Sequence, residues 1–122
     1  MEQSRTLSVV IPCFNEAGTL AAIVDEVASI ETSDLKLEVL IVDDRSTDGS
    51  AERAAEIAAS RANVRVIAHE KNMGKGAALR TGFMAATGDY VGIQDADLEY
   101  DPRDYLKLVS TLEEERADVV FG

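Results

Sequence analysis

The stretch Val39-Leu40-Ile41-Val42-Asp43-Asp44 decides the fold of this chain, because four apolar residues end abruptly in two acids. A continuous apolar run is typical of a strand buried on both faces, as in a parallel sheet. The strand that it predicts covers residues 37–42. Similar β-type runs recur along the chain, at residues 7–11 (before Pro12), 64–68, 90–93 and 117–121.

The segments between these strands have helical patterns. Residues 17–30 place five apolar side chains at helical spacing: Leu20, Ile23, Val24, Val27 and Ile30. Residues 50–60 are rich in alanine, and one side of that helix is predicted to consist of Ala51, Ala54, Ala55 and Ala58. Two more helices are predicted, over residues 77–86 and after Asp101-Pro102, which has the pattern of an N-cap followed by proline.

The alternation of strands and helices predicts the fold class. It implies an α/β domain with a mainly parallel sheet, helices on both faces and right-handed crossovers. With 122 residues, the chain is long enough for one such domain, over residues 1–122. No closing helix follows residues 117–121. We therefore interpret the domain either as truncated at its C-terminal end or as covered there by an oligomeric partner.

Composition and charge argue against several classes of protein. The net charge of −11 disfavours a nucleic-acid-binding protein and an electrostatic hold on anionic lipid. No apolar run approaches the roughly 20 residues of a membrane span, and the polar N-terminus is not a secretory signal. The single cysteine, Cys13, excludes an internal disulfide and is expected to be a small buried residue. These features predict a cytoplasmic protein.

Two carboxylates, Asp95 and Asp97, follow the strand predicted over residues 90–93. Such a pair repels itself unless a cation lies between the two groups. Mg²⁺ and Mn²⁺ prefer oxygen ligands and often arrive with phosphates. Ligands of open α/β sheets bind at the carboxyl ends of the strands, where this pair is expected. A metal–diphosphate site is therefore favoured over helix capping, since Asp101 already supplies a cap.

Other strand ends also carry polar groups. Asp43 and Asp44 either bind a ligand or, with Ser46-Thr47-Asp48-Gly49, cap the next helix; a ligand is favoured for Asp43 and left open for Asp44. Gly74-Lys75-Gly76 either binds an anion at the start of a helix or is a flexible turn with a solvated lysine. The only histidine, His69, is expected to be a surface or loop residue, so a histidine triad or zinc cluster is not available.

Four motifs together resemble the family 2 glycosyltransferases, which have the GT-A fold. In chain order they are Val9-Val10-Ile11-Pro12-Cys13-Phe14-Asn15-Glu16, Ile41-Val42-Asp43-Asp44-Arg45-Ser46-Thr47-Asp48, Asn72-Met73-Gly74-Lys75-Gly76-Ala77-Ala78-Leu79, and Ala86-Thr87-Gly88-Asp89 followed by Gln94-Asp95-Ala96-Asp97-Leu98-Glu99. The motifs cover nearly the whole chain. Residues 95–102 look most similar to the dolichol-phosphate mannosyltransferase-like branch. The resemblance implies a Rossmann-like domain that binds a nucleoside-diphosphate sugar.

The resemblance also implies roles for particular residues. The base and ribose would be lined by Pro12, Phe14 and Glu16. Asp43 would hydrogen-bond the base, and Lys75 would lie near the nucleotide or its phosphates. The Asp-x-Asp motif that meets the metal and the donor diphosphate would be Asp95, Ala96 and Asp97, with Asp97 as the catalytic candidate and Glu99 as a further metal ligand.

Two positions depart from the usual family pattern. Phe14, after Cys13, keeps an aromatic ring but loses a phenol hydroxyl. Arg45 stands where a glycine is common, so the turn after the acid pair is expected to differ.

The implied activity is transfer of a sugar from GDP-mannose or a UDP-hexose, with Mg²⁺ or Mn²⁺, by single displacement with inversion. One acceptor consistent with the resemblance is a polyprenyl phosphate, which would bring the protein to the cytoplasmic face of a membrane. Three alternatives were weighed. A nucleotidyltransferase would need a glycine-rich basic loop at residues 13–16, and a receiver domain would need an aspartate after residue 68. A donor-binding fragment without activity stays open.

Overall fold

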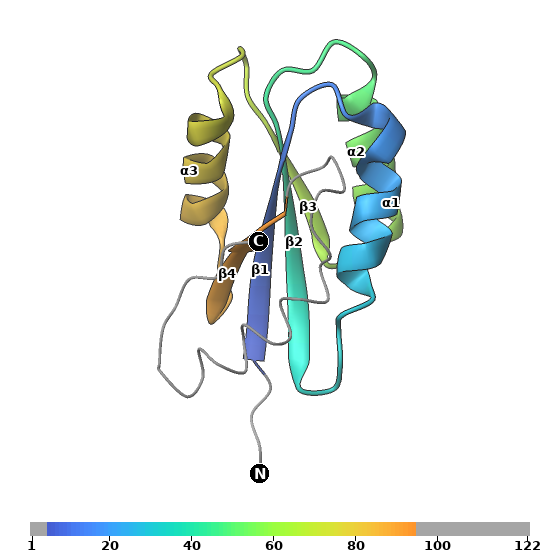
Figure 1. Ribbon diagram of the computed structural model, residues 1–122, viewed down its shortest axis with the longest axis vertical. Coiled ribbons are helices and arrows are strands. Elements are labelled where there is room, and N and C mark those ends of the chain that lie inside the picture. Colours follow the sequence, from blue (N-terminus) through green and yellow to red (C-terminus); the bar gives the residue numbers. More distant parts are fainter. Residues whose placement is uncertain (1–4, 95–122) are drawn as a thin grey trace.

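The computed structural model describes residues 5–94, in which strands and helices alternate along the chain (Figure 1). The elements are β1 (Arg5–Cys13), α1 (Ala17–Ala28), β2 (Leu35–Asp43), α2 (Ser50–Ser60), β3 (Val64–Ala68), α3 (Lys75–Ala85) and β4 (Tyr90–Ile93). Within this part of the chain, no helix combines the length and the hydrophobicity needed to cross a membrane. The predictions for residues 95–122, including the helix after Asp101 and the last strand, lie outside the described residues.

The sheet has the order β3-β2-β1-β4, and every neighbouring pair of strands is parallel. Strand β1 lies in the middle: Leu7 is in register with Leu37 of β2 on one side and with Tyr90 of β4 on the other. This arrangement confirms the predicted α/β class. It also places the carboxyl ends of all four strands at one edge of the sheet.

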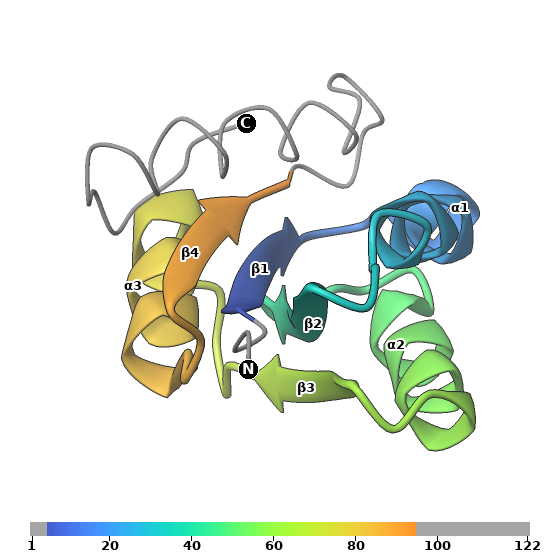
Figure 2. The same cartoon turned by 90° about the horizontal axis from the view of Figure 1, so that it is seen from below.

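Helices cover both faces of the sheet, as predicted (Figure 2). The larger core lies on the side of α1 and α2, where Val9 and Ile11 of β1 pack with Leu20 and Ile23 of α1. Val10 of β1 belongs to a smaller core on the side of α3. Because successive side chains of a strand point to opposite faces, β1 contributes to both cores.

The smaller core allows α3 to lie very close to the sheet. The side chains that α3 buries are short, since its buried residues are Ala78 and Gly82. A Cβ atom added at Gly82 would lie 2.3 Å from Cγ1 of Val10. Glycine is therefore required at this position by the contact between helix and strand.

The sequence placed the described elements well but erred on some bounds and faces. Strand β1 continues through Pro12 to Cys13, and α3 begins at Lys75 rather than at residue 77. Ala55 was predicted on the packed side of α2 but is exposed. The apolar residues that α2 buries are Ala54 and Ile57. Cys13 is a buried free thiol, as expected.

Candidate functional site

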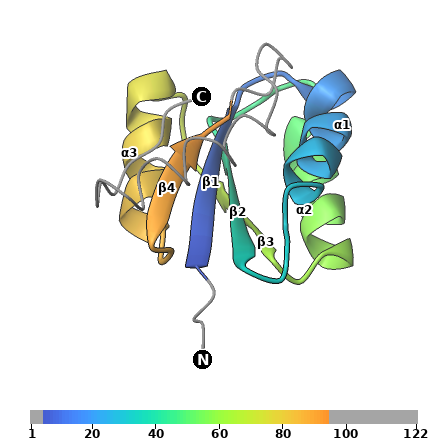
Figure 3. The ribbon, with the colours of Figure 1, turned by 60° about the horizontal axis from the view of Figure 1, so that its bottom comes forward.

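The loops that follow β1, β2 and β3 come together at the carboxyl edge of the sheet (Figure 3). Backbone hydrogen bonds join the three strand ends there: Asp44 N donates to Cys13 O over 2.9 Å, and His69 N donates to Asp43 O over 2.9 Å. At the end of β4, Gln94 N donates to Val10 O over 3.0 Å. The polar clusters predicted at four strand ends therefore follow strands that end at one edge.

The loop after β1 is fixed to the loop after β2 by side chains. Asn15 adopts a left-handed conformation (φ 56°), and its Oδ1 accepts the Thr47 N–H at 2.8 Å. The Ser50 hydroxyl accepts the Glu16 N–H at 2.9 Å. The N-cap of α2 is Gly49, within the segment predicted to cap this helix, and Asp48 before it accepts the N–H of Ser50, the first helical residue, at 3.0 Å. These bonds hold the loop after β1 and the loop after β2 together, and we call the surface that the two loops form the wall.

Three residues predicted to line the base and ribose lie on or beside this wall. Pro12 and Glu16 are half-buried, whereas 45% of Phe14 is exposed. A large exposed aromatic ring at a strand end is available for stacking on a planar ligand.

Asp43 ends β2 and forms a tight turn with Ser46. Its Oδ1 accepts the Ser46 hydroxyl at 2.6 Å, and its Oδ2 accepts the Ser46 N–H at 3.1 Å. Arg45, inside this turn, has a φ of 62°, the left-handed region that favours glycine. Arginine therefore adopts a left-handed conformation here at some cost in strain, and the expected difference of this turn from the usual family pattern stays a prediction.

Asp44 is buried and holds the loop after β3. Its Oδ1 accepts the Met73 N–H and its Oδ2 the Gly74 N–H, each at 2.8 Å, and its backbone carbonyl accepts Nδ2 of Asn72 at 3.1 Å. Burial alone would raise the pKa of the Asp44 carboxyl. The hydrogen bonds from His69, Met73 and Gly74 outweigh burial and hold that pKa below its usual value.

His69 was expected on the surface or in a loop. It does lie in the loop between β3 and α3, but its side chain is only 8% exposed, so the surface interpretation is wrong. One ring nitrogen, Nδ1, lies 2.8 Å from Oδ1 of Asp44, and the other, Nε2, lies 2.8 Å from Oγ1 of Thr81. Both partners are distant in sequence, and no local pattern signals them.

The start of α3 was predicted either to bind an anion or to be a solvated turn. Gly74 caps the helix with a φ of 94°, and Lys75 is the first helical residue and is exposed. The carboxylate of Asp44 takes the N–H groups of Met73 and Gly74. An anion is thus present at this helix start, and it comes from the chain itself.

The predicted metal ligands Asp95, Asp97 and Glu99 lie outside the described residues, as does Ala96 of the same motif. Within residues 5–94, no group of three or more His, Cys, Asp or Glu side chains is arranged to hold a metal ion. The metal site stays a prediction, on residues that follow Gln94 in the sequence.

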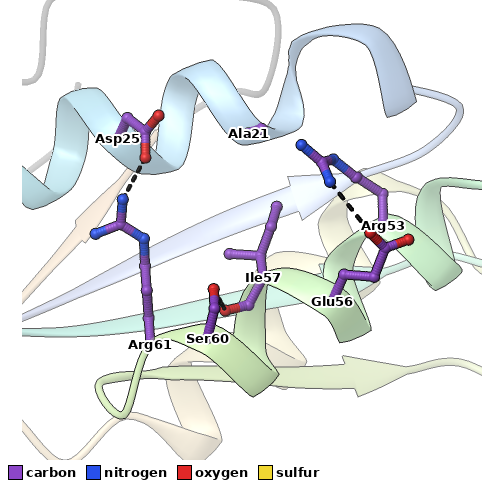
Figure 4. A pocket seen from close by; sticks show the side chains of 7 residues that line it. All are labelled: Ala21, Asp25, Arg53, Glu56, Ile57, Ser60 and Arg61. Atoms are coloured by element: carbon purple, nitrogen blue, oxygen red, sulfur yellow. Dashed lines mark hydrogen bonds and ion pairs between the residues drawn. The ribbon is translucent and has the colours of Figure 1, made fainter.

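A groove of about 340 Å³ lies elsewhere, between α1 and α2 (Figure 4). Its charged residues are already paired, Arg61 with Asp25, and Arg53 with Glu56 at 3.2 Å. None of the predicted site residues lines it. We therefore place the candidate site at the carboxyl edge and not in this groove.

The chain is similar to known proteins over nearly its whole length. The family model described as "Glycosyl transferase family 2" matches residues 8–122. A dodecaprenyl-phosphate galacturonate synthase from Rhizobium johnstonii is 34% identical over 122 residues, which cover 98% of this chain and 36% of that protein. A dolichol-phosphate mannosyltransferase from Pyrococcus furiosus is 33% identical over 116 residues, which cover 95% of this chain and 32% of that protein.

A solved structure gives the same result for the fold. The mannosyltransferase of Pyrobaculum calidifontis, in complex with GDP-Man and Mn²⁺, matches with a TM-score of 0.72 and 31% identity over 86% of this chain and 31% of that chain. The present chain thus spans about a third of the length of the relatives it matches.

Proposed function

The chain belongs to glycosyl transferase family 2, and we propose that it forms the donor-binding part of an enzyme that transfers a sugar from a nucleoside-diphosphate sugar. The observation that carries the proposal is the carboxyl edge, where the loops after β1, β2 and β3 meet and where ligands of parallel α/β sheets bind. Family membership decides against the nucleotidyltransferase and receiver alternatives. The strand order also argues against a receiver domain. In a receiver β1 pairs with β3, whereas here β1 lies between β2 and β4.

The nucleotide would bind on the wall formed by the first two loops. The exposed ring of Phe14 offers a stacking surface, and Pro12 and Glu16 flank it in sequence. Asp43 is held in one orientation by Ser46, and each carboxylate oxygen can accept more than one hydrogen bond. A fixed acceptor of this kind suits an N–H group of either uracil or guanine, so the geometry favours neither GDP nor UDP.

The diphosphate would need a cation, because the chain as a whole is strongly acidic. At the end of β2, the carboxylates of Asp43 and Asp44 already accept hydrogen bonds from the chain itself. A divalent ion would therefore rest on Asp95, Asp97 and Glu99, whose oxygens are the ligands that Mg²⁺ and Mn²⁺ prefer. When bound, such an ion neutralises charge on the departing nucleoside diphosphate. Lys75 would add positive charge from the start of α3.

We propose a polyprenyl phosphate as the acceptor, because both curated relatives described above are named for a lipid phosphate of this kind. A phosphate oxygen is already anionic at neutral pH, so the reaction depends more on positioning than on a strong protein base. Such an acceptor would bring the protein to a membrane surface. The described residues offer the donor side, and the acceptor side would come from other parts of the enzyme.

Calorimetric titration of the chain with GDP and with UDP, each with Mn²⁺ and again with excess chelator, tests this proposal. We expect one nucleotide to bind only when metal is present. Asp97→Ala should abolish the metal-dependent part of binding. Asp34→Ala is the matched control, since Asp34 is exposed in the loop between α1 and β2, at the opposite edge of the sheet.

The outcomes separate the parts of the proposal. Unchanged affinity in Asp97→Ala would disprove the metal site but leave nucleotide binding intact. Absence of binding by either nucleotide would contradict the donor site itself. Sugar transfer to a polyprenyl phosphate by the chain alone would rule out a binding-only role.

A further inference from the structure

Asp44, His69 and Thr81 form a buried cluster that no step of the proposed function uses. The side chains of Asp44 and His69 are 6% and 8% exposed. Together, Asp44, His69 and Thr81 join three elements that are distant in sequence: the end of β2, the loop after β3 and the middle of α3.

The chemistry of the partners sets the direction of each hydrogen bond. An ionised carboxylate only accepts, so Nδ1 of His69 carries the proton that faces Asp44. In the neutral ring, Nε2 then accepts the Thr81 hydroxyl at 2.8 Å. The loop residues Met73 and Gly74 donate to the same Asp44 carboxylate. One carboxylate therefore fixes the loop and, through the ring, the helix.

Apolar contacts also hold the first turns of α3, because Ala78 is buried and Leu79 is partly buried in the smaller core. The residues that α3 buries, Ala78 and Gly82, are small and give the sheet little apolar surface to grip. Glycines flank Lys75 on both sides, and a Cβ atom at either Gly74 or Gly76 would meet nothing within 4 Å. The loop that Asp44 holds leads directly into Lys75, so the polar contacts of Asp44 help to set the position of Lys75.

We propose that Asp44, His69 and Thr81 are positioning residues that orient the start of α3 so that Lys75 faces the donor nucleotide. This inference rests on the proposed function, which assigns Lys75 to the nucleotide or its phosphates. It also resolves the open role of Asp44, which acts through the loop and does not touch the ligand.

A double-mutant cycle tests the proposal, with calorimetry of the full chain against the nucleotide that the wild type binds, with Mn²⁺. Thr81→Val removes the hydroxyl while keeping the shape of the side chain. We expect it to weaken nucleotide binding about tenfold, the size of one net hydrogen bond within a protein. Lys75→Ala should weaken binding by a similar factor, and the double variant no more than Lys75→Ala alone, because both act through the same group.

Two further variants keep the test independent of general destabilisation. Thr87→Val is the matched control: it removes a hydroxyl that donates to Glu38 at 2.8 Å beyond the other end of α3, and it should leave nucleotide affinity within about twofold, as expected for an independent site. Thr81→Ser restores the hydroxyl and should restore binding.

Each outcome decides between the claims. Additive effects of Thr81→Val and Lys75→Ala, equal weakening by Thr87→Val, or failure of Thr81→Ser to restore affinity would overturn the positioning role while the proposed function stands. Full affinity in Lys75→Ala would do the same. If the wild-type chain binds neither GDP nor UDP, the proposed function fails and the positioning role fails with it.

Discussion

Two carboxylates connect helix α3 with strand β2, one near each end of the helix, and the two connections differ. Before the start of the helix, Asp44 accepts hydrogen bonds from two backbone N–H groups and from Nδ1 of His69. Just beyond the end of the helix, Glu38 accepts the Thr87 N–H and hydroxyl, each at 2.8 Å, and the Ser8 hydroxyl at 2.7 Å. The Asp44 side chain is 6% exposed, and that of Glu38 is 19% exposed.

The difference separates stability from binding. Both carboxylates anchor the same helix, so both should contribute to the free energy of unfolding. Only Asp44 holds a loop that leads into a residue assigned to the donor. Changes at the Asp44 end should therefore alter both stability and nucleotide affinity, whereas changes at the Glu38 end should alter stability alone.

The largest effect is expected from Asp44→Ala. The change leaves two backbone N–H groups and an imidazole N–H, all partly buried, without their acceptor, which should lower the free energy of unfolding by about 4 kcal/mol. Urea denaturation measures the loss, and calorimetry with GDP or UDP should show weaker binding in conditions where the variant is still folded. A stable variant with wild-type affinity would contradict the assignment.

Glu38→Ala should have a smaller effect on stability. Water can reach part of this site, so we expect a loss of about 2 kcal/mol. Nucleotide affinity should stay at the wild-type value. If Glu38→Ala weakened nucleotide binding as much as Asp44→Ala, the two ends of α3 would be equivalent and the comparison would fail.

The middle of α3 gives a third test. Gly82→Ala forces a Cβ atom against Val10 and should cost about 1.5 kcal/mol by overpacking. Gly76→Ala is the control on the same helix, because its Cβ atom would meet nothing within 4 Å and the higher helix propensity should add up to about 1 kcal/mol. Thermal denaturation of both variants should give shifts of opposite sign.

The smallest effect is expected in the acid limb of stability. Burial alone would raise the pKa of Glu38, but hydrogen bonds from Thr87 and Ser8 outweigh burial and hold that pKa below its usual value of 4.5. The pKa of Asp44 likewise lies below its usual value of 3.8. A group with a lowered pKa stabilises the fold above its unfolded pKa and loses that contribution as pH falls through the folded one. Urea titrations from pH 6 downward should show Glu38→Gln and Asp44→Asn losing stability less steeply than wild type below the usual carboxyl range, about pH 4.

Much of this fold follows from local patterns. The apolar run at residues 39–42 predicts a buried parallel strand, and the helical spacing of Leu20, Ile23 and Val27 predicts α1 and its buried face. Bounds were less well predicted: within residues 5–94, Pro12 pairs with Val42 of β2 alone, and a strand tolerates proline where one of its sides is unpaired. The exposed position of Ala55 shows that alanine marks a helix without marking its packed face.

The candidate site was only partly predictable. The carboxyl-edge location follows from the parallel topology, which the strand pattern implies. The role of Asp44 does not follow from the strand pattern, because its carboxylate oxygens accept hydrogen bonds from N–H groups 25–30 residues away along the chain. Burial of His69 likewise depends on Thr81, whose position is known only once α3 is docked on the sheet.

The central place of β1 has a consequence for how the protein folds. Its partners on the two sides come from very different distances along the chain: Leu7 pairs with Leu37, about 30 residues on, and with Tyr90, more than 80 residues on. Long-range parallel pairing closes large loops before it is rewarded, and it slows folding. During synthesis, one edge of β1 therefore stays unpaired with β4 until residues 90–93 emerge, and an unpaired strand edge makes an early nascent chain prone to aggregation.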